Sequence, residues 1–421
     1  MTTTKRHAAI SLASFAMLAA PSAFADPAAP EAPPAAAVAA AAAPAAPVAA
    51  PAAPKPKAWY DVVKVEAFVD AYGSYNANAP KPQAGANTGH AYDANTGFAL
   101  NWAGVNATVA AEPVGGTVSL RFGQAAHIYN GAGLAGTDSA NGMTLVKQAY
   151  ATWKPGGADG KLTLDFGKYD QPFGSEVADS QYNINYTRGL LYWYAQPLFF
   201  TGVRADYAVS DTLDVKLFAM NGWNASVDNN AGKTVGAQIN LKPSATSLIA
   251  IGWAGGPEQA DVAGGAAVEG QNMRFRHLVD VVGDFTFDKL RLLGNFDYGM
   301  ETVLDPADAS KTKKAKWYGG SLAASYTISD TWMLGARGEY YADPDGFTVA
   351  GAYASADDTK KLTLVSATAT IAAKPTPNLM LKLDGRMDKA LDDKKPFPKG
   401  IGDAPTDSQI TATLGVVVTT N

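Results

Sequence analysis

Apolar and polar residues alternate along many separate stretches of this sequence, and this alternation constrains the fold more than any other feature. In the stretch 63–71, valine and alanine alternate with Lys64, Glu66 and Asp70. The same period recurs in stretches that begin near residues 118, 162, 279, 290, 379 and 410. A period of two is typical of β-strands that have one apolar and one polar face. No helical period of comparable length competes after residue 58, so we predict an all-β fold.

Short turns and long polar segments alternate strictly between the predicted strands. The seven short turns lie near residues 112–116, 155–160, 210–212, 242–245, 287–289, 329–331 and 374–378. The eight long segments lie near 76–96, 131–142, 170–198, 223–232, 256–271, 301–314, 343–359 and 390–407. Outer-membrane barrels show this asymmetry because their periplasmic turns are short and their extracellular loops are long. The count implies an antiparallel transmembrane β-barrel of about 16 strands, with 14 to 18 left open.

A soluble β-sandwich also has alternating strands, but three features favour the membrane. Many of the predicted strands are longer than the roughly five or six residues usual in soluble sheets. An apolar face occurs on nearly every strand, which would leave a soluble domain without a solvent face. Aromatic residues also gather at strand ends, where a membrane barrel places its interfacial girdles. Examples are Trp59, Trp153, Tyr298, Trp317 and Trp332.

The first 57 residues differ from the rest in composition. Lys5 and Arg6 precede an apolar stretch from Ala8 to Ala20 and an A-x-A site at residues 23–25, so residues 1–25 are expected to be a signal peptide. Residues 26–57 are almost wholly Ala and Pro, which predicts an extended periplasmic tether. The tether is either a simple spacer or a segment that contacts the cell wall. Residues 58–421 are expected to form the barrel.

Enzyme chemistry is not favoured by this sequence. Cysteine is absent, which excludes thiol catalysis and thiolate metal sites. No nucleophile elbow and no His-Glu-x-x-His motif is present, so we expect no catalytic site, no metal and no cofactor. The formal net charge of −5 gives no support for nucleic-acid binding.

The third long segment, residues 170–198, combines charge with an apolar second half. Its charged residues are Asp170, Glu176, Asp179 and Arg188. The part from Leu190 to Phe200 is too apolar to remain in water and must be buried. We predict that the segment folds toward the lumen and narrows the pore. Alternatively, Leu190–Phe200 belongs to the sixth strand or to a subunit contact.

Charged residues on the polar face of the strands would line a water-filled lumen. The candidate wall cations are Arg121, Arg204, Arg291, Arg337 and Arg386. Opposite charges across a pore orient dipolar solutes and sort ions, whereas pairs between adjacent strands would only make the lumen polar. Aromatic residues of the third segment are candidates for stacking on solutes: Tyr182, Tyr186, Tyr192, Trp193 and Tyr194.

The stretches Phe166–Gly174, Asn185–Leu191 and Thr201–Arg204 resemble bacterial outer-membrane porins, most closely the OmpL-like β-barrel porin family. The resemblance covers roughly residues 60–421. It implies a passive channel for small hydrophilic solutes and ions in outer-membrane lipid, and it is compatible with a homotrimer. It also implies that acidic residues of the third loop face a basic wall cluster, with Arg121, Arg204 and Arg291 as candidates.

Three hypotheses about function follow from these observations. The first is passive diffusion through a water-filled channel. The second is selective uptake of sugar-type solutes, with the aromatic residues of the third loop stacking on sugar rings. The third is a structural or adhesive barrel that acts through its loops and its tether.

Overall fold

A computed structural model describes residues 62–81, 84–131, 143–263, 266–305, 308–349 and 361–420. The chain divides into two units, Met1–Pro56 and Lys57–Asn421, and every described residue belongs to the second. The predicted signal peptide (1–25) and the predicted tether (26–57) lie outside the described residues.

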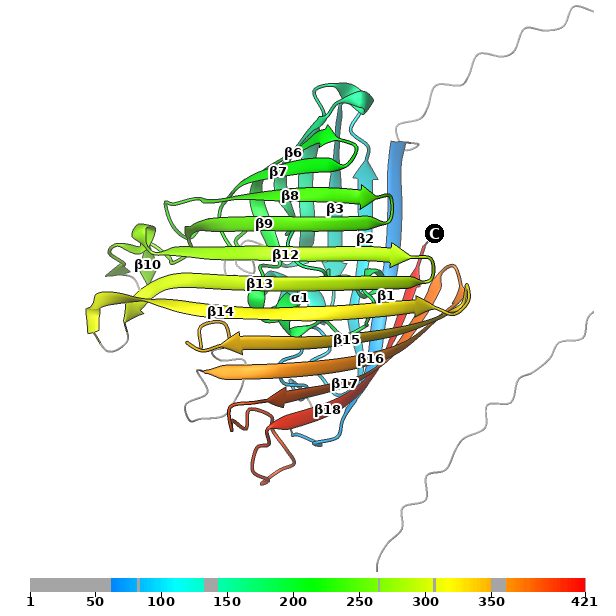
Figure 1. The fold of residues 1–421 in the computed structure, drawn as a ribbon, viewed down its shortest axis with the longest axis vertical. Coiled ribbons are helices and arrows are strands. Elements are labelled where there is room, and N and C mark those ends of the chain that lie inside the picture. Colours follow the sequence, from blue (N-terminus) through cyan, green and yellow to red (C-terminus); the bar gives the residue numbers. More distant parts are fainter. Residues whose placement is uncertain are drawn as a thin grey trace, which may run out of the picture. The chain divides into compact units, whose positions relative to one another are not determined.

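Sixteen antiparallel strands close into one barrel, which confirms the predicted fold (Figure 1). Each strand pairs with the next barrel strand along the chain, and β1 closes the barrel by pairing with β18. The first eight are β1 (Val63–Asn76), β2 (Gly97–Val109), β3 (Val114–Phe122), β4 (Val146–Trp153), β5 (Leu162–Asp170), β6 (Phe199–Ser210), β7 (Leu213–Met220) and β8 (Thr234–Ser244). The others are β9 (Ser247–Pro257), β12 (Phe275–Phe287), β13 (Leu290–Asp305), β14 (Asp308–Thr327), β15 (Trp332–Asp343), β16 (Leu362–Thr376), β17 (Leu379–Ala390) and β18 (Ser408–Thr419).

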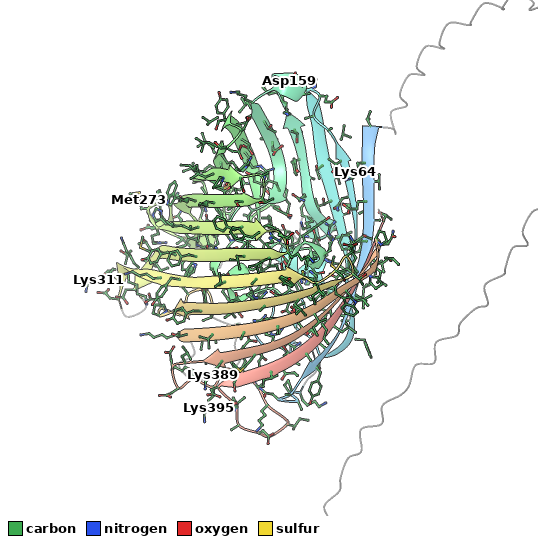
Figure 2. All side chains as sticks on the ribbon, turned by 45° about the vertical axis from the view of Figure 1, so that its right-hand side comes forward. Lys64, Asp159, Met273, Lys311, Lys389 and Lys395 are labelled. Carbon is green, nitrogen blue, oxygen red and sulfur yellow. The ribbon has the colours of Figure 1, made fainter. Side chains whose placement is uncertain are left out.

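The connections differ between the two rims of the barrel. On the turn rim, consecutive strands are joined by tight turns such as that between Ser210 and Leu213. On the loop rim, we name the connections L1 (77–96), L2 (123–145), L3 (171–198), L4 (221–233), L5 (258–274), L6 (306–307), L7 (344–361) and L8 (391–407). Figure 2 shows Lys64 and Asp159 toward the turn rim and Met273, Lys311, Lys389 and Lys395 toward the loop rim.

Three connections differ from the sequence prediction. The segment 301–314 was expected to be a long loop, but β13 and β14 run through it and leave only L6 between them. Its polar residues continue the strand ladder instead of leaving the sheet. L2 contains a short helix, α1 (Gln124–Gly131), and L5 contains a small hairpin of β10 (Val262–Ala263) and β11 (Ala266–Ala267). Neither element showed a periodic pattern long enough to predict.

The two faces of the strands have opposite chemistry. On β17, Lys382, Asp384 and Arg386 are buried inside the barrel, whereas Leu383 and Met387 are exposed on the outer surface. This arrangement of apolar exterior and polar interior is that of a barrel whose outer face contacts lipid. Among the described residues, no helix is both long enough and apolar enough to cross a membrane.

Candidate pore constriction

L3 lies inside the barrel and hydrogen-bonds to strands on several sides of the wall. The Gly174 N–H donates to Asp280 of β12 at 3.0 Å, and the Leu190 N–H donates to Glu339 of β15 at 2.8 Å. Further contacts are Gln196 Nε2 to Asp297 of β13 at 2.7 Å, Thr187 N to Asp384 of β17 at 2.8 Å and Tyr186 Oη to Asp70 of β1 at 2.6 Å. Because these strands surround the lumen, L3 must cross it more than once.

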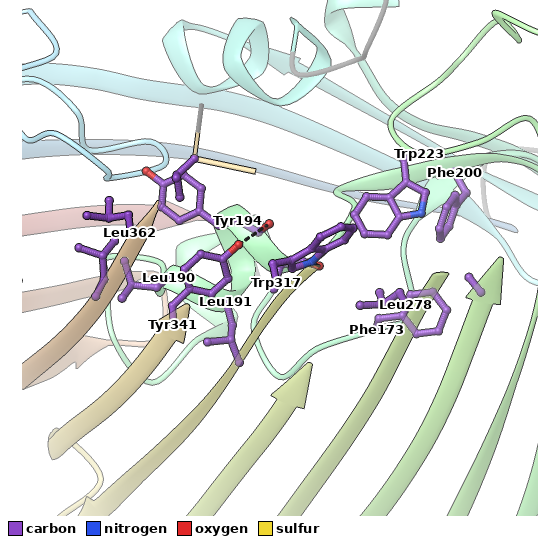
Figure 3. Packing of buried hydrophobic residues seen from close by; sticks show 14 of the residues in the cluster. Phe173, Leu190, Leu191, Tyr194, Phe200, Trp223, Leu278, Trp317, Tyr341 and Leu362 are labelled. Carbon is purple, nitrogen blue, oxygen red and sulfur yellow. Dashed lines mark hydrogen bonds between the residues drawn. The ribbon is translucent and has the colours of Figure 1, made fainter. Parts of the chain in front are cut away.

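The apolar second half of L3 packs against the inner wall of the barrel. Residues Leu191–Ala195 form one turn of π-helix, and the cluster around them includes Trp317 of β14 and Tyr341 of β15 (Figure 3). Trp317 Nε1 donates to the Ala195 carbonyl at 3.1 Å, which satisfies the indole N–H away from water. Burial is therefore inside the barrel, and only the last two residues of Leu190–Phe200 belong to β6.

Wall glycines make room for side chains of L3. A Cβ at Gly415 of β18 would lie 2.0 Å from the Tyr186 ring, and one at Gly252 of β9 would lie 2.6 Å from the Phe173 ring. The same relation joins Gly319 to Leu191 at 2.9 Å and Gly335 to Ile184 at 2.8 Å. Four strands of the wall are thus shaped to the loop, and larger side chains there would force it away.

The acidic part of L3 meets two cations of the wall at Asp179. Arg121 of β3 donates to both carboxylate oxygens of Asp179, at 3.2 and 3.1 Å, and Lys147 of β4 lies 3.2 Å away. Lys147 also pairs with Asp170. Burial alone would raise the pKa of Asp179, but Lys147 and Arg121 hold it below its usual value. The two buried cations therefore stabilise the ionised form of Asp179.

A second ion pair lies at the opposite side of the lumen. Glu176 Oε1 accepts a hydrogen bond from Arg337 of β15 at 2.6 Å, and its Oε2 accepts one from the Gly189 N–H at 2.7 Å. Arg337 also bonds Glu339 at 3.0 Å. Burial raises the pKa of Glu176, with Arg337 acting against this shift and Glu339 adding to it. Glu176 ties the two arms of L3 to each other and to the wall.

Arg188, the fourth charged residue predicted in the third long segment, is buried within L3. Its guanidinium carbon lies 4.9 Å from the Tyr92 ring of L1 and 5.7 Å from the Tyr186 ring, and it donates to the carbonyls of Tyr186 and Ala178. These contacts fix the path of L3. Arg188 does not present its charge to the open lumen.

The five predicted wall arginines fall into two groups. Arg121 and Arg337 contact acidic residues of L3, as described above. Arg204 pairs with Asp165 at 2.6 Å, Arg291 with Asp284 at 2.7 Å and Arg386 with Asp388 at 2.8 Å. Arg204 and Arg291 thus each pair with an aspartate on the adjacent strand, whereas Arg121 and Arg337 pair with acidic residues of L3.

Several residues of this site were not predicted. Lys147 was not predicted as a wall residue because the register shifts between Ser119 and Leu120 on the paired strand β3. This shift breaks the alternation of faces on β4. The contribution of L1 had no sequence signal at all. The hydroxyl groups of Tyr92 and Tyr192 are hydrogen-bonded, with their oxygens 2.7 Å apart, so L1 packs directly on L3.

L1 is held by a buried histidine between two carboxylates. His90 Nδ1 lies 2.7 Å from Asp93, and Nε2 lies 3.1 Å from Asp388 of β17. Burial and Arg386 act to lower the pKa of His90, but the two carboxylates more than offset them and raise it above its usual value. Both ring nitrogens face an acceptor, so the geometry suits an imidazolium that donates twice.

The predicted stacking residues differ in accessibility. Tyr182 is 55% exposed and lies between two hollows of about 350 Å³ and 310 Å³ near the turn rim. Trp193 is half-buried, and the other three, Tyr186, Tyr192 and Tyr194, are buried against protein. In this conformation, only Tyr182 offers a solute a widely open ring face.

L1 and L3 cover the polar inner face of the wall on almost every side of the barrel. Among the described residues, buried polar side chains occur on strands throughout the barrel: Asp70, Arg121, Lys147, Gln238, Asp280, Asp297, Arg337, Thr368, Lys382, Arg386 and Thr411. The described parts of L1 and L3 therefore fill much of the cross-section of the barrel.

A closed sixteen-stranded barrel with an apolar exterior, a charged interior and an inward-folded third loop defines the porin class of outer-membrane protein. Sequence comparison makes the assignment specific. Residues 62–419 match the family described as "Putative beta-barrel porin-2, OmpL-like", and the chain belongs to this family. No curated protein matches the chain in sequence.

Solved outer-membrane porins share the fold at low sequence identity. An anion-selective porin from Comamonas acidovorans has a TM-score of 0.54 at 11% identity, covering 85% of this chain and 99% of its own. OprB of Pseudomonas putida has a TM-score of 0.53 at 12% identity, covering 85% and 94%. The channel DcaP of Acinetobacter baumannii has a TM-score of 0.51 at 13% identity, covering 84% and 96%. These likenesses concern the fold alone.

Proposed function

We propose that this protein is an outer-membrane channel for passive diffusion of small hydrophilic solutes and ions, and that L3 sets the width of its lumen. The observation that carries the proposal is the course of L3. Its backbone and side chains bond to β12, β13, β15, β17 and β1 across the lumen. A loop tied across a pore limits conductance directly, because the current must pass between the loop and the wall.

The charges at this level supply a basis for selectivity. Asp179 faces Arg121 and Lys147 on one side, and Glu176 faces Arg337 on another. The partners of each pair are in direct contact, so no solute passes between them; the pairs instead place charged groups beside the passage, and such groups sort ions. In this proposal the loop rim faces the outside of the cell, the tether lies in the periplasm, and the barrel carries no enzyme activity.

Planar-bilayer conductance of the full mature chain tests the proposal. The parent protein is expected to give small, ohmic steps, and removal of residues 176–196 is expected to enlarge them. A matched control is removal of residues 260–269, which takes out the β10–β11 hairpin of L5 while leaving L3 intact. Both variants are first checked for a folded barrel by heat-modifiable gel mobility. Unchanged steps after removal of 176–196 would reject L3 as the constriction, and folded protein without any conductance would reject the channel.

Selective uptake of sugar-type solutes is a second candidate, and one observation favours it. The exposed ring of Tyr182 lies beside polar groups of L3 and the wall, including Gln181 and Lys374. An aromatic face with nearby hydrogen-bonding groups is suited to a sugar ring. Block of the current by one class of sugar separates this candidate from general diffusion.

A further inference from the structure

Asp280 of β12 and Asp297 of β13 are direct partners across two neighbouring strands, and both are fully buried. Directly paired residues on one face of a sheet have Cβ atoms about 4.5–5.5 Å apart, so the two carboxyl groups are close neighbours. Like charges placed directly opposite in a sheet repel each other. A buried pair of this kind is stable when the two carboxyl groups share one proton.

Among the described residues, the hydrogen-bond donors to the pair are all uncharged. Asp280 accepts hydrogen bonds from the Gly174 N–H at 3.0 Å and from Asn295 at 2.8 Å, and Asp297 accepts one from Gln196 at 2.7 Å. All three donors are neutral. These donors all bind the Oδ2 atoms. Among the described residues, the Oδ1 atom of each aspartate has no hydrogen-bond donor.

The arginines on the same two strands pair with other carboxylates. Arg276, on the same strand as Asp280, pairs with Glu301, and Arg291, on the same strand as Asp297, pairs with Asp284. Tyr341 is the titratable side chain that β15 brings near the pair, and it bonds to Thr348 and to the Tyr194 carbonyl. L3 contributes only uncharged groups to this contact, so a proton is the positive charge that the pair can hold without rearrangement.

The pair also holds both arms of L3. Gly174 lies on the arm that enters the lumen from β5, and Gln196 lies on the arm that returns to β6. Gln196 reaches Asn295 as well, at 2.8 Å, so the returning arm is bound to two adjacent residues of β13. One site on the wall thus anchors the start and the end of the loop.

We propose that Asp280 and Asp297 share one proton and in that state latch both arms of L3 to the wall, so that loss of the proton loosens L3. The strands cannot separate to relieve the repulsion, because ladder pairing joins β12 to β13 on both sides of the pair. Relief requires water at the carboxylates, and water reaches them only when L3 moves aside. The consequence for conductance rests on the proposed function of the barrel; the movement of L3 does not.

Thiol labelling measures the movement of L3 without any assumption about transport. The chain contains no cysteine, so Ser175→Cys places a single thiol next to Gly174 and Ser329→Cys places a reference thiol on an exposed turn. The full mature chain in vesicles is labelled with a methanethiosulfonate reagent. The ratio of the Ser175→Cys rate to the Ser329→Cys rate removes the common effect of pH on thiol ionisation.

The labelling ratio is expected to rise roughly tenfold between about pH 6 and about pH 9, the order of effect that one like-charge contact produces. In the Asp297→Asn background the amide donates permanently to Asp280, so the ratio should stay low and flat. Asp280→Asn should behave in the same way, which protects the test if one variant fails to fold. Asp284→Asn is the matched control, because it removes a carboxylate that binds Arg291 and does not touch L3.

Three results would overturn the latch: a flat ratio in the parent, a rise that persists in both Asn variants, or control by added Ca²⁺ at fixed pH with no response to pH. Conductance recorded on the same proteins separates the latch from the channel. A labelling ratio that follows the prediction in protein without conductance supports the latch and rejects the proposed function. A conductance that rises with pH while the ratio stays flat rejects the latch.

Discussion

Gly415 of β18 and Tyr186 of L3 are packed so closely that a Cβ on the glycine would lie 2.0 Å from Cδ2 of the ring. The Tyr186 hydroxyl donates to Asp70 on the next strand, β1, which fixes the ring against this part of the wall. The absence of a side chain at position 415 is therefore part of the binding site for L3.

Gly415→Ala is expected to push Tyr186 and its part of L3 away from β18. Overpacking of this kind costs about 1–3 kcal/mol, and the displaced loop should enlarge single-channel conductance. Gly385→Ala on the adjacent strand is the control, because a Cβ there meets nothing within 4 Å. Conductance and urea unfolding of both variants check the prediction. Equal behaviour of the two would show that L3 does not depend on the Gly415 contact.

Asp179→Asn should shift ion selectivity toward anions. The change leaves Arg121 and Lys147 buried without their shared carboxylate, although Lys147 retains Asp170. Removal of one partner from a buried ion pair costs about 3–5 kcal/mol, and the uncompensated positive charge should attract anions to the passage. The reversal potential under a salt gradient measures this shift. The control is Asp159→Asn, at an exposed turn on the turn rim, which should leave the reversal potential unchanged.

L1 should loosen as the pH rises, because of His90. The folded-state pKa of His90 lies above its unfolded value, despite burial, since Asp93 and Asp388 stabilise the imidazolium. The stabilisation is complete below the unfolded pKa of about 6.5 and is lost as the pH rises through the folded value. Hydrogen exchange of the peptide that spans residues 85–95, corrected for the intrinsic rate, should therefore accelerate at alkaline pH. In His90→Gln this dependence should be absent, whereas His127→Gln on α1 should retain it.

Tyr182 provides the test of solute stacking. If a sugar class blocks the current, Tyr182→Ala should weaken the block roughly tenfold, since an aromatic contact contributes on the order of 1 kcal/mol or more. Tyr182→Phe keeps the ring face and should retain most of the block. Titration of the current with the sugar measures both. A block of the same strength in Tyr182→Ala would place the solute elsewhere.

The barrel itself was predictable from local patterns. Each strand exposes one face to lipid and one to the interior, so the period of two in stretches such as 63–71 had to appear along the chain. The contrast between short turns and long loops yielded the correct strand count of 16. The amphipathic alternation marked Arg121 and Arg337 as wall residues, and both contact L3. The apolar character of Leu190–Phe200 required burial, and burial is what the structure shows.

The partners of these residues were decided only by the tertiary structure. Arg204 and Arg291 bind wall aspartates rather than L3, and Lys147 enters the site through a shift in register. The contacts of L3 join residues more than one hundred positions apart, such as Tyr186 with Asp70 and Gly174 with Asp280. A local pattern specifies which face a residue occupies, because that depends on its own strand. It does not specify what lies opposite, because that depends on how a long loop folds back across a closed barrel.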